Sequence, residues 1–381
     1  MSHQISAIGK AAWAELFRFI NERNASRILV VTGRSCYSMS GAADSLKPIL
    51  ENREVTFVTE FEQNPKAEDV VRILAGLGSP ADYDVILAVG GGSVMDVAKL
   101  IKGYWESPLP VYGNLQRGEE LNPCDIPLVA IPTTAGSGSE ATHFAVVYLG
   151  KEKFSVAHNN LLPDLAVIVP SLLTSLPRHI AAASGMDALC QGIESYWSIF
   201  STDESQRMAG EAISLAWRSL EKSVLDKEPT AIEEIARASH LAGKAINLTK
   251  TTAPHAVSYA LTSFYGLQHG HAVALLVPEF LKYNAAVTSD DCLDHRGVEW
   301  VHRQLMEISQ KLGCFSIMSA ANALKEMMKN IGLETSFNKL GIKSEEDIDQ
   351  LVKNGFNPQR VNNNPRLVTK RALEDLLKSS N

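Results

Sequence analysis

Short runs of β-branched and aliphatic residues alternate with helical patterns from about residue 27 to residue 170, and this alternation restricts the fold more than any other feature. The runs are RILVVT, VTFVTE, YDVILAVG, PLVAIPTT and LAVIVP. Strands separated by helices predict βαβ units and a parallel sheet. Because DVILAVG and LVAIP are apolar almost throughout, we expect helices to cover both faces of this sheet.

The pattern changes after about residue 171, where helical periodicity continues to the C-terminus with few β-branched runs. A chain of 381 residues is also too long for one ordinary hydrophobic core. We therefore expect an N-terminal α/β domain with a parallel sheet, residues 1–172, and an all-α C-terminal domain, residues 173–381. The connection is expected near Pro170 to Pro177.

Composition excludes several classes of protein. A net charge of −7 without a basic stripe argues against a nucleic-acid partner. The five cysteines are widely spaced and form no CxxC pair, which indicates a reducing, cytoplasmic setting. No segment reaches the roughly 18 uninterrupted apolar residues that a membrane helix needs, so no membrane partner is expected.

A glycine-rich turn follows the strand YDVILAVG at Gly91, Gly92 and Ser93, before a helix that contains Asp96. Glycines at a strand-to-helix junction let backbone N–H groups approach a phosphate, and the helix N-terminus adds partial positive charge. The spacing is not GxGxxG, so it does not by itself specify a dinucleotide site. A tight structural turn without a ligand is the alternative interpretation.

The next strand ends in a second turn of small residues, which begins with Thr133 and Thr134. Two such turns at the carboxyl ends of strands in one sheet predict a nucleotide crevice. A third strand end carries Gly33, Arg34 and Ser35, where a carboxylate would select the ribose of NAD(H). Because an arginine stands there, we expect NADP(H) rather than NAD(H), unless Arg34 is only a solvated surface charge.

Polar residues in the helical half predict a metal site. Asp187 and Gln191 are four residues apart and share one helix face. One carboxylate with two imidazoles, His255 and His269, matches a zinc or iron site with an open position. The alternative is that these histidines are satisfied core residues, which is the commoner role of histidine in an apolar segment.

The two histidines would not meet on one straight helix, because they are 14 residues apart. Gly266 and Gly270 predict a bend before His269. Such a bend could return His269 towards Asp187.

Several segments, in this order and spacing, resemble the iron-containing (group III) alcohol dehydrogenase family. They are GGGSVMDVAK, IPTTAGSGSE, SGMDALCQGIES and the segment that runs from His255 to the His-Gly pair at His269. The resemblance covers nearly the whole chain and reaches NNNPRLVT, around Asn364, Pro365 and Arg366.

The resemblance implies a first domain that binds NAD(P) and a helical second domain that holds one Fe(II) or Zn(II). The family's ligands, an aspartate and three histidines, fall by position on Asp187, Gln191, His255 and His269. Gln191 departs from that pattern, and its neutral carbonyl oxygen is a weaker ligand than imidazole. Tyr259 is a second departure, where family members often have another histidine; proton donation and simple packing are both open for it.

The resemblance also implies the reaction and the cofactor site. It predicts reversible hydride transfer between the nicotinamide and the carbonyl carbon of a small-molecule aldehyde or alcohol, and a homodimer or larger homo-oligomer. It places the cofactor pyrophosphate on the first glycine turn. The residues implied at the cofactor are Gly91, Gly92, Ser93, Asp96, Thr133, Thr134 and Lys153, although Lys153 could be an ordinary surface lysine.

The segment before His255 bears on the substrate. Lys250, Thr251 and Thr252 are polar and basic where many family members are small and apolar, and an ammonium with hydroxyls pairs well with phosphate-like oxygens. This segment looks like the phosphonoacetaldehyde reductase subgroup, which implies reduction of phosphonoacetaldehyde to 2-hydroxyethylphosphonate. A solvated Lys250 with packing threonines is the alternative.

Three other functions stay open on the sequence. A generic short-chain alcohol or aldehyde dehydrogenase would use the same residues without an anion pocket. A dehydroquinate synthase-like lyase would share the two-domain plan, with bound NAD and zinc but no net oxidation of the cofactor. A non-catalytic binding protein is the third, and the retained Asp187, His255 and His269 argue against it.

Overall fold

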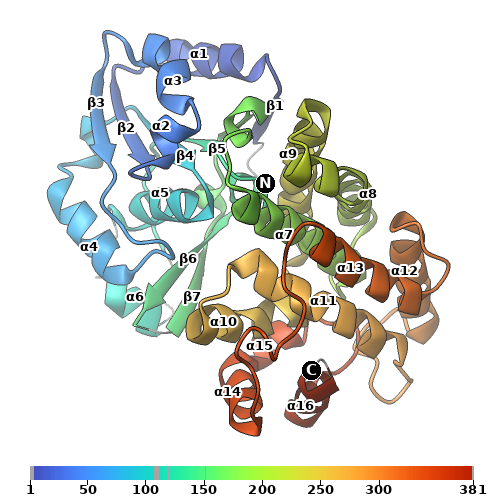
Figure 1. Ribbon diagram of the computed structural model, residues 1–381. Coiled ribbons are helices and arrows are strands. Elements are labelled where there is room, and N and C mark those ends of the chain that lie inside the picture. The colour runs from blue at the N-terminus through green and yellow to red at the C-terminus, as the bar shows by residue number, and fades with distance from the viewer. Residues whose placement is uncertain (1–3, 107–110, 118–120, 151, 380–381) are drawn as a thin grey trace. The chain divides into compact units, whose positions relative to one another are not determined.

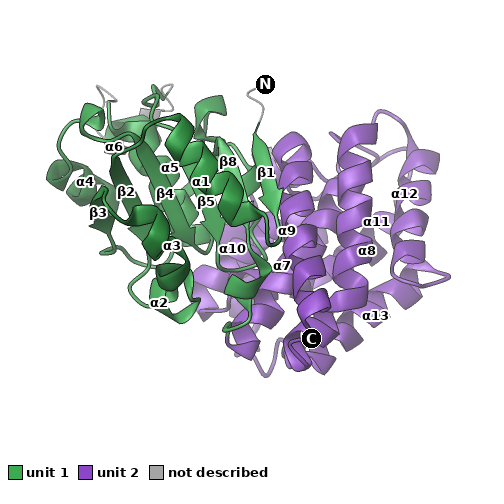
Figure 2. Ribbon diagram, turned by 90° about the horizontal axis from the view of Figure 1, so that it is seen from above, with its two compact units in different colours: residues 1–176 green, residues 177–381 purple. Residues whose placement is uncertain are grey.

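The computed structural model describes residues 4–106, 111–117, 121–150 and 152–379. The chain divides into two compact units, residues 1–176 and 177–381 (Figure 2). The division after residue 176 lies shortly beyond a 3-10 helix, η4 (Pro170–Leu173). The predicted division, after residue 172, lies within η4.

The first unit is built on a six-stranded sheet in which every neighbouring pair is parallel. The strand order is β1-β8-β5-β4-β2-β3; β8 is labelled in Figure 2, and the other five strands are labelled in Figure 1 as well. Its strands are β1 (Ile5–Ile8), β2 (Arg27–Thr32), β3 (Glu54–Val58), β4 (Val85–Gly90), β5 (Leu128–Pro132) and β8 (Leu165–Ile168). The predicted α/β fold with a parallel sheet is confirmed.

Successive residues of the central strands enter two different cores, as the two-residue repeat of a strand requires. Ile28 and Val30 face a core closed by α1 and α3, whereas Leu29 and Val31 face a core closed by α4 and α5. Helices on both faces explain why these strands are apolar throughout. The helices of this unit are α1 (Ala12–Glu22), α2 (Cys36–Met39), α3 (Ala42–Leu50), α4 (Ala67–Gly76), α5 (Gly92–Tyr104) and α6 (Val111–Arg117), with 3-10 helices η1 (Pro80–Asp82), η2 (Ser139–Ala141) and η3 (Asn159–Leu161).

Three strands were not predicted from the sequence. β1 has only four residues, ISAI, and pairs with β8 at the end of the sheet. β6 (Phe144–Leu149) and β7 (Glu152–Ala157) form a separate antiparallel pair. This pair does not belong to the alternation of strand and helix, so the pattern that predicts the main sheet does not reveal it.

The second unit is helical, as predicted. It consists of α7 (Arg178–Trp197), α8 (Asp203–Leu225), α9 (Pro229–Thr249), α10 (Ala253–Tyr265), α11 (His269–Ala285), α12 (Val298–Lys311), α13 (Ile317–Asn330), α14 (Glu345–Gly355), α15 (Pro358–Val361) and α16 (Lys370–Ser379). α7 contacts α8, α9, α11 and α12, and nearly all of it from Ala182 onward is buried. Its polar side chains are therefore enclosed by other helices.

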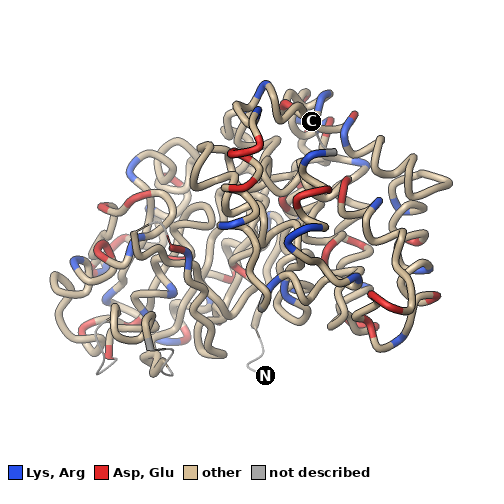
Figure 3. The backbone as a smooth tube through the Cα atoms, turned by 90° about the horizontal axis from the view of Figure 1, so that it is seen from below, with Lys and Arg blue, Asp and Glu red and all other residues tan. Residues whose placement is uncertain are grey.

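Charged residues of both signs are interspersed along the backbone of both units (Figure 3). None of the helices among the described residues combines the length and the apolar character that crossing a membrane requires. All five cysteines are free thiols.

Candidate metal centre and cofactor turns

Three side chains from three helices meet in the second unit. Asp187 lies on the buried helix α7, His255 in the first turn of α10, and His269 is the first residue of α11. One potential ligand atom from each lies within 4.8 Å of the others. His255 Nε2 is 3.3 Å from Asp187 Oδ1, and the two imidazole rings are 5.3 Å apart between centroids.

The break between α10 and α11 brings the second histidine to this point. α10 ends at Tyr265 and is followed by Gly266, whose φ of +67° is the left-handed conformation that ends many helices. The predicted bend is therefore present, but Gly270 takes no part in it. Gly270 lies inside α11, where its backbone packs so closely on the carbonyl of Ala183 in α7 that a side chain there would overlap it.

Glu194 completes the surroundings of His255 and was not predicted from the sequence. It is fully buried on α7, and its carboxylate accepts a hydrogen bond from Nδ1 of His255. It also accepts from the backbone N–H and the hydroxyl of Thr252, at 2.9 and 2.8 Å. Glu194 is seven residues after Asp187, so the two side chains lie on the same helix face. That spacing is the feature of the sequence from which Glu194 could have been predicted.

The charges around His255 favour a cation at this point. Burial by itself lowers the pKa of His255, but the carboxylates of Glu194 and Asp187 outweigh burial and raise the pKa to about 10. A bound metal ion would supply the positive charge in place of the proton. His255 Nε2 is buried and has no hydrogen-bond partner among the described residues, as expected of an atom that faces a ligand.

The donor set fits a divalent metal. Two imidazole nitrogens and one carboxylate, with a fourth position left for water or substrate, is a common arrangement for catalytic zinc and also suits iron. Gln191 lies one turn beyond Asp187 on α7 and is 3% exposed, so its carboxamide is enclosed on the same face. A metal ion held here supplies Lewis-acid polarisation of a carbonyl oxygen.

Tyr259 and Lys250, which were predicted near the substrate, lie in different surroundings. The ring of Tyr259 stacks on that of His269, with centroids 5.7 Å apart and planes 17° apart. The guanidinium of Arg360, on α15, lies 5.0 Å from the centre of the Tyr259 ring. Lys250 is exposed at the end of α9, in a backbone conformation of φ +58° and ψ 175°.

Thr252 does not fit the predicted anion pocket. Its hydroxyl donates to Glu194 and accepts from Nε1 of Trp197 at 2.9 Å, and the residue is 1% exposed. Both hydrogen-bonding functions of this hydroxyl are therefore used inside the protein. The expectation that Thr252 pairs with a substrate is wrong, because its hydroxyl is occupied by Glu194 and Trp197.

The topology of the first unit places the glycine turns where a nucleotide site is expected. The chain runs from β2 to β3 on one side and then to β4 on the other side of β2. Ligands of open α/β sheets bind outside the carboxyl ends of strands at such a reversal. Gly33 follows β2 and Gly91 follows β4, so both lie at this edge.

The two predicted turns lie against each other. A Cβ atom built at Gly91 would be 3.1 Å from the hydroxyl oxygen of Thr134, and one at Gly92 would be 3.0 Å from that of Ser137. Thr133 donates its backbone N–H to the carbonyl of Gly90 at 2.9 Å. α5 begins here without a side-chain cap, which leaves its N-terminus suited to a phosphate.

Asp96 holds the second turn in place. Its carboxylate accepts a hydrogen bond from the hydroxyl of Ser139 at 3.2 Å. Loss of solvation raises the pKa of Asp96 to about 6, although Lys99 and Lys153 oppose the shift. Lys99 is fully buried and donates to Ser139, Thr142 and the carbonyl of Phe144 at 2.6–3.0 Å. Lys153, on β7, thus lies near Asp96. Lys99 fixes the loop between the turn and β6.

Arg34 is not a lone surface charge. Its guanidinium forms an ion pair with Glu60, just beyond β3. A carboxylate therefore lies beside Arg34, contributed by the segment that follows β3. The segment Gly33 to Ser35 itself contains no acid, as predicted, and the preference for NADP(H) over NAD(H) stays a prediction. A Cβ at Gly33 would lie 2.9 Å from Cys36 Sγ, so a side chain there would require Cys36 to shift, and Ser35 precedes α2.

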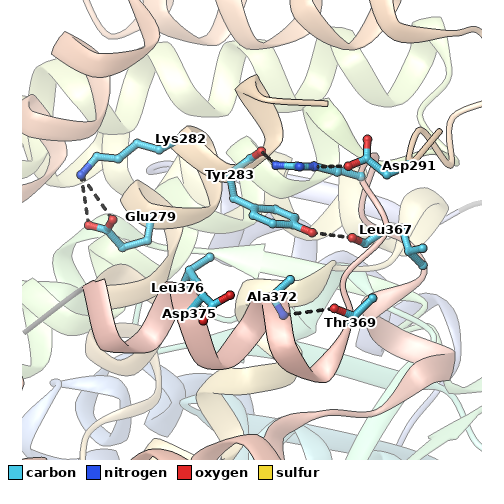
Figure 4. Close-up of a pocket in the computed structure, with 10 residues that line it drawn as sticks. Glu279, Lys282, Tyr283, Asp291, Leu367, Thr369, Ala372, Asp375 and Leu376 are labelled. Atoms are coloured by element: carbon cyan, nitrogen blue, oxygen red, sulfur yellow. Dashed lines mark hydrogen bonds and ion pairs between the residues drawn. The ribbon is translucent and has the colours of Figure 1, made fainter. Parts of the chain in front are cut away.

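A separate pocket of about 610 Å³ in the second unit lies between α11 and α16 (Figure 4). It is lined by residues that include Tyr283, Asp291 and Arg366, and by none of the three clustered metal ligands. Arg366 pairs with Asp291 at 2.7 Å and donates to the carbonyl of Tyr283 at 2.8 Å. The Asn-Pro-Arg segment therefore ties the C-terminal segment to α11.

Comparison with protein families matches both units. Residues 4–170 match the model of the iron-containing alcohol dehydrogenases, and residues 181–381 match the C-terminal model of the same family. The chain belongs to the iron-containing alcohol dehydrogenase family. It is therefore an oxidoreductase, and the lyase and the non-catalytic binding protein are set aside.

Individual relatives in this family resemble the chain over nearly its full length. The chain is 35% identical to a phosphonoacetaldehyde reductase of Streptomyces viridochromogenes, over 93% of this chain and 90% of the relative. It is 28% identical to an NAD-dependent methanol dehydrogenase of Bacillus methanolicus, over 98% and 97%. Among solved structures, a sulfoacetaldehyde reductase of Bifidobacterium kashiwanohense in complex with NAD+ superposes with a TM-score of 0.88 at 27% identity, over 100% of this chain and 97% of the other.

Proposed function

We propose that this iron-containing alcohol dehydrogenase reduces phosphonoacetaldehyde to 2-hydroxyethylphosphonate with a nicotinamide cofactor. One observation carries the proposal: a phosphonoacetaldehyde reductase and a sulfoacetaldehyde reductase are both relatives over nearly the full chain. Both names describe an acetaldehyde that carries an oxyanion group. A substrate with a carbonyl at one end and an oxyanion at the other is their shared chemistry.

The second unit supplies the proposed carbonyl site. Asp187, His255 and His269 would hold one divalent metal, Fe(II) or Zn(II), which would supply Lewis-acid polarisation of the substrate carbonyl. Tyr259 closes one side of His269 by stacking on it. Burial of Asp187 and His255 strengthens their electrostatic effect on the reacting carbonyl.

The first unit supplies the proposed cofactor site. Gly91, Gly92 and Ser93 bind the pyrophosphate at the start of α5, and Thr133 and Thr134 line the neighbouring turn. Gly33, Arg34 and Ser35 lie at the adenosine ribose, with Asp96 and Lys153 behind the turns. A nicotinamide bound there would supply the hydride for the carbonyl carbon, and a proton on the carbonyl oxygen would complete the alcohol.

Two basic residues are candidates for the phosphonate. Lys250 is exposed at the end of α9, close in sequence to the capped start of α10. Arg360 lies over Tyr259, which itself stacks on a proposed ligand, and no carboxylate among the described residues forms an ion pair with it. Either cation would compensate the oxyanion of the substrate.

The test is oxidation of NADH and NADPH by protein loaded separately with Fe(II) and Zn(II). Phosphonoacetaldehyde is compared with a neutral aldehyde of similar length, in the wild type and in Lys250→Ala and Arg360→Gln. We expect a preference for the phosphonate of at least about tenfold in kcat/KM, because a paired charge contributes on the order of 1.4 kcal/mol or more. One of the two variants, Lys250→Ala or Arg360→Gln, should lose this preference for phosphonoacetaldehyde.

Equal rates on the two aldehydes would contradict the phosphonate assignment and leave a general short-chain aldehyde reductase. The methanol dehydrogenase relative favours that second candidate. Loss of the preference in Arg360→Gln alone would move the anion site from α9 to α15.

A further inference from the structure

We infer that Glu194 is a positioning residue of the metal centre, which fixes the His255 ring and strengthens its Nε2 atom as a ligand. This inference rests on the proposed metal site. It concerns a residue that makes no contact with substrate or cofactor in the proposed reaction and acts through His255.

The two carboxylate oxygens of Glu194 have different partners. Oε2 faces Nδ1 of His255. Oε1 accepts from the backbone N–H of Thr252 at 2.9 Å, from its hydroxyl at 2.8 Å, and from the backbone N–H of His255 at 3.3 Å. The start of α10 therefore holds the carboxylate, and the carboxylate in turn holds the imidazole.

This arrangement decides which nitrogen faces the metal. When Nδ1 donates its proton to Glu194, the neutral ring carries its lone pair on Nε2, and Nε2 is the atom that lies 3.3 Å from Asp187 Oδ1. A carboxylate behind a histidine ligand fixes the tautomer, orients the ring and raises the basicity of the coordinating nitrogen.

The burial of Glu194 shows how the fold stabilises this charge. An isolated carboxylate with 0% exposure would be costly. Here it sits at the N-terminus of α10, where the helix dipole and three N–H or O–H donors stabilise a negative charge. The carboxylate occupies that helix end, so the substrate oxyanion is bound elsewhere.

The test is metal affinity of the full-length protein, measured by competition with a chelator for Zn(II) and Co(II), together with the visible absorption of the Co(II) form. Glu194→Gln keeps the volume and removes the charge. Ser195→Ala is the matched control, because Ser195 is the next residue on α7, is equally buried, and loses one hydrogen bond, from Thr249 at 2.9 Å.

We expect Glu194→Gln to weaken metal binding about 10–100-fold and to change the Co(II) spectrum, because loss of a residue behind a ligand has effects of that size. Ser195→Ala should leave both unchanged. Thr252→Val, which removes one donor to Glu194, should weaken binding by an intermediate factor.

Affinities of Glu194→Gln and Ser195→Ala that both match the wild type would overturn the inference. If Glu194→Gln does not fold, an unchanged affinity in Thr252→Val would overturn it. If the wild-type protein binds neither Zn(II) nor Co(II), the proposed metal centre and the proposed function are both overturned. This measurement on the wild type is made before any variant.

Discussion

Gly270 on α11 and Ala183 on α7 touch backbone to backbone: a Cβ atom at Gly270 would lie 2.0 Å from the Ala183 carbonyl oxygen and 2.7 Å from Asp187 Cβ. The contact joins the helix that carries Asp187 to the helix that begins with His269. The separation of two proposed metal ligands is therefore set by a glycine that is not itself a ligand.

Substitution of Gly270 should cost much more than substitution of a neighbouring glycine. We expect Gly270→Ala to lower the free energy of unfolding by about 2–4 kcal/mol, because α11 must move away from α7. Gly266→Ala is the control, since Gly266 has open space but a φ of +67°, and should cost about 1 kcal/mol. Urea denaturation of both variants tests this, and equal losses would argue against the close contact.

Gln191 should limit metal affinity. Imidazole is a better ligand than a neutral carboxamide for zinc, so we expect Gln191→His to tighten Zn(II) binding about tenfold or more. Chelator competition measures the change, and the midpoint of thermal unfolding of the zinc form should rise with it. A histidine variant that binds zinc no more tightly than the wild type would show that position 191 does not face the ion.

The backbone of Lys250 predicts a stabilising substitution. A φ of +58° with ψ 175° is a region that glycine adopts almost exclusively. We expect Lys250→Gly to raise the free energy of unfolding by about 1 kcal/mol and Lys250→Ala to give no such gain. If Lys250 also binds the phosphonate, both variants should raise the KM for phosphonoacetaldehyde equally, which separates the two roles of the residue.

The ion pair between Arg34 and Glu60 should govern cofactor preference. Glu60→Gln releases Arg34 and removes a negative charge near the proposed ribose site. We expect the ratio of kcat/KM for NADPH to that for NADH to rise on the order of fivefold, the effect of one exposed charge pair. Arg34→Gln should lower the same ratio. Unchanged ratios in both variants would place the 2'-phosphate elsewhere.

Asp84 should contribute stability that is lost in acid. Burial opposes the shift, but hydrogen bonds from Arg27 and Ser26 lower the pKa of Asp84 to about 2, from 3.8. A lowered pKa in the folded state means that the contribution is complete above about pH 4 and disappears towards pH 2. We expect Asp84→Asn to lose about 1–2 kcal/mol at pH 7 and to differ little from the wild type near pH 2, as measured by denaturant titration.

Local patterns predicted much of the architecture. The five apolar runs all correspond to strands of the parallel sheet, because burial on both faces leaves a nearly unbroken apolar sequence. The change to helical periodicity after residue 171 and the helix break at Gly266 could also be predicted from the sequence, since both depend on residues that are close together in the chain. The hairpin of β6 and β7 escaped prediction because it lies outside that alternation.

Which residues face one another was decided only by the tertiary structure. The sequence by itself determined the residue types that the chemistry needs, with Asp187, His255 and His269 at spacings that permit a metal site and with glycine turns after β4 and β5. It did not determine that Glu194 supports His255, that Thr252 is occupied inside the protein, or that Glu60 pairs with Arg34. Periodicity reports the face of one element, whereas these contacts join elements 26 to 61 residues apart, and only the packing of those elements brings the partner atoms within hydrogen-bonding distance.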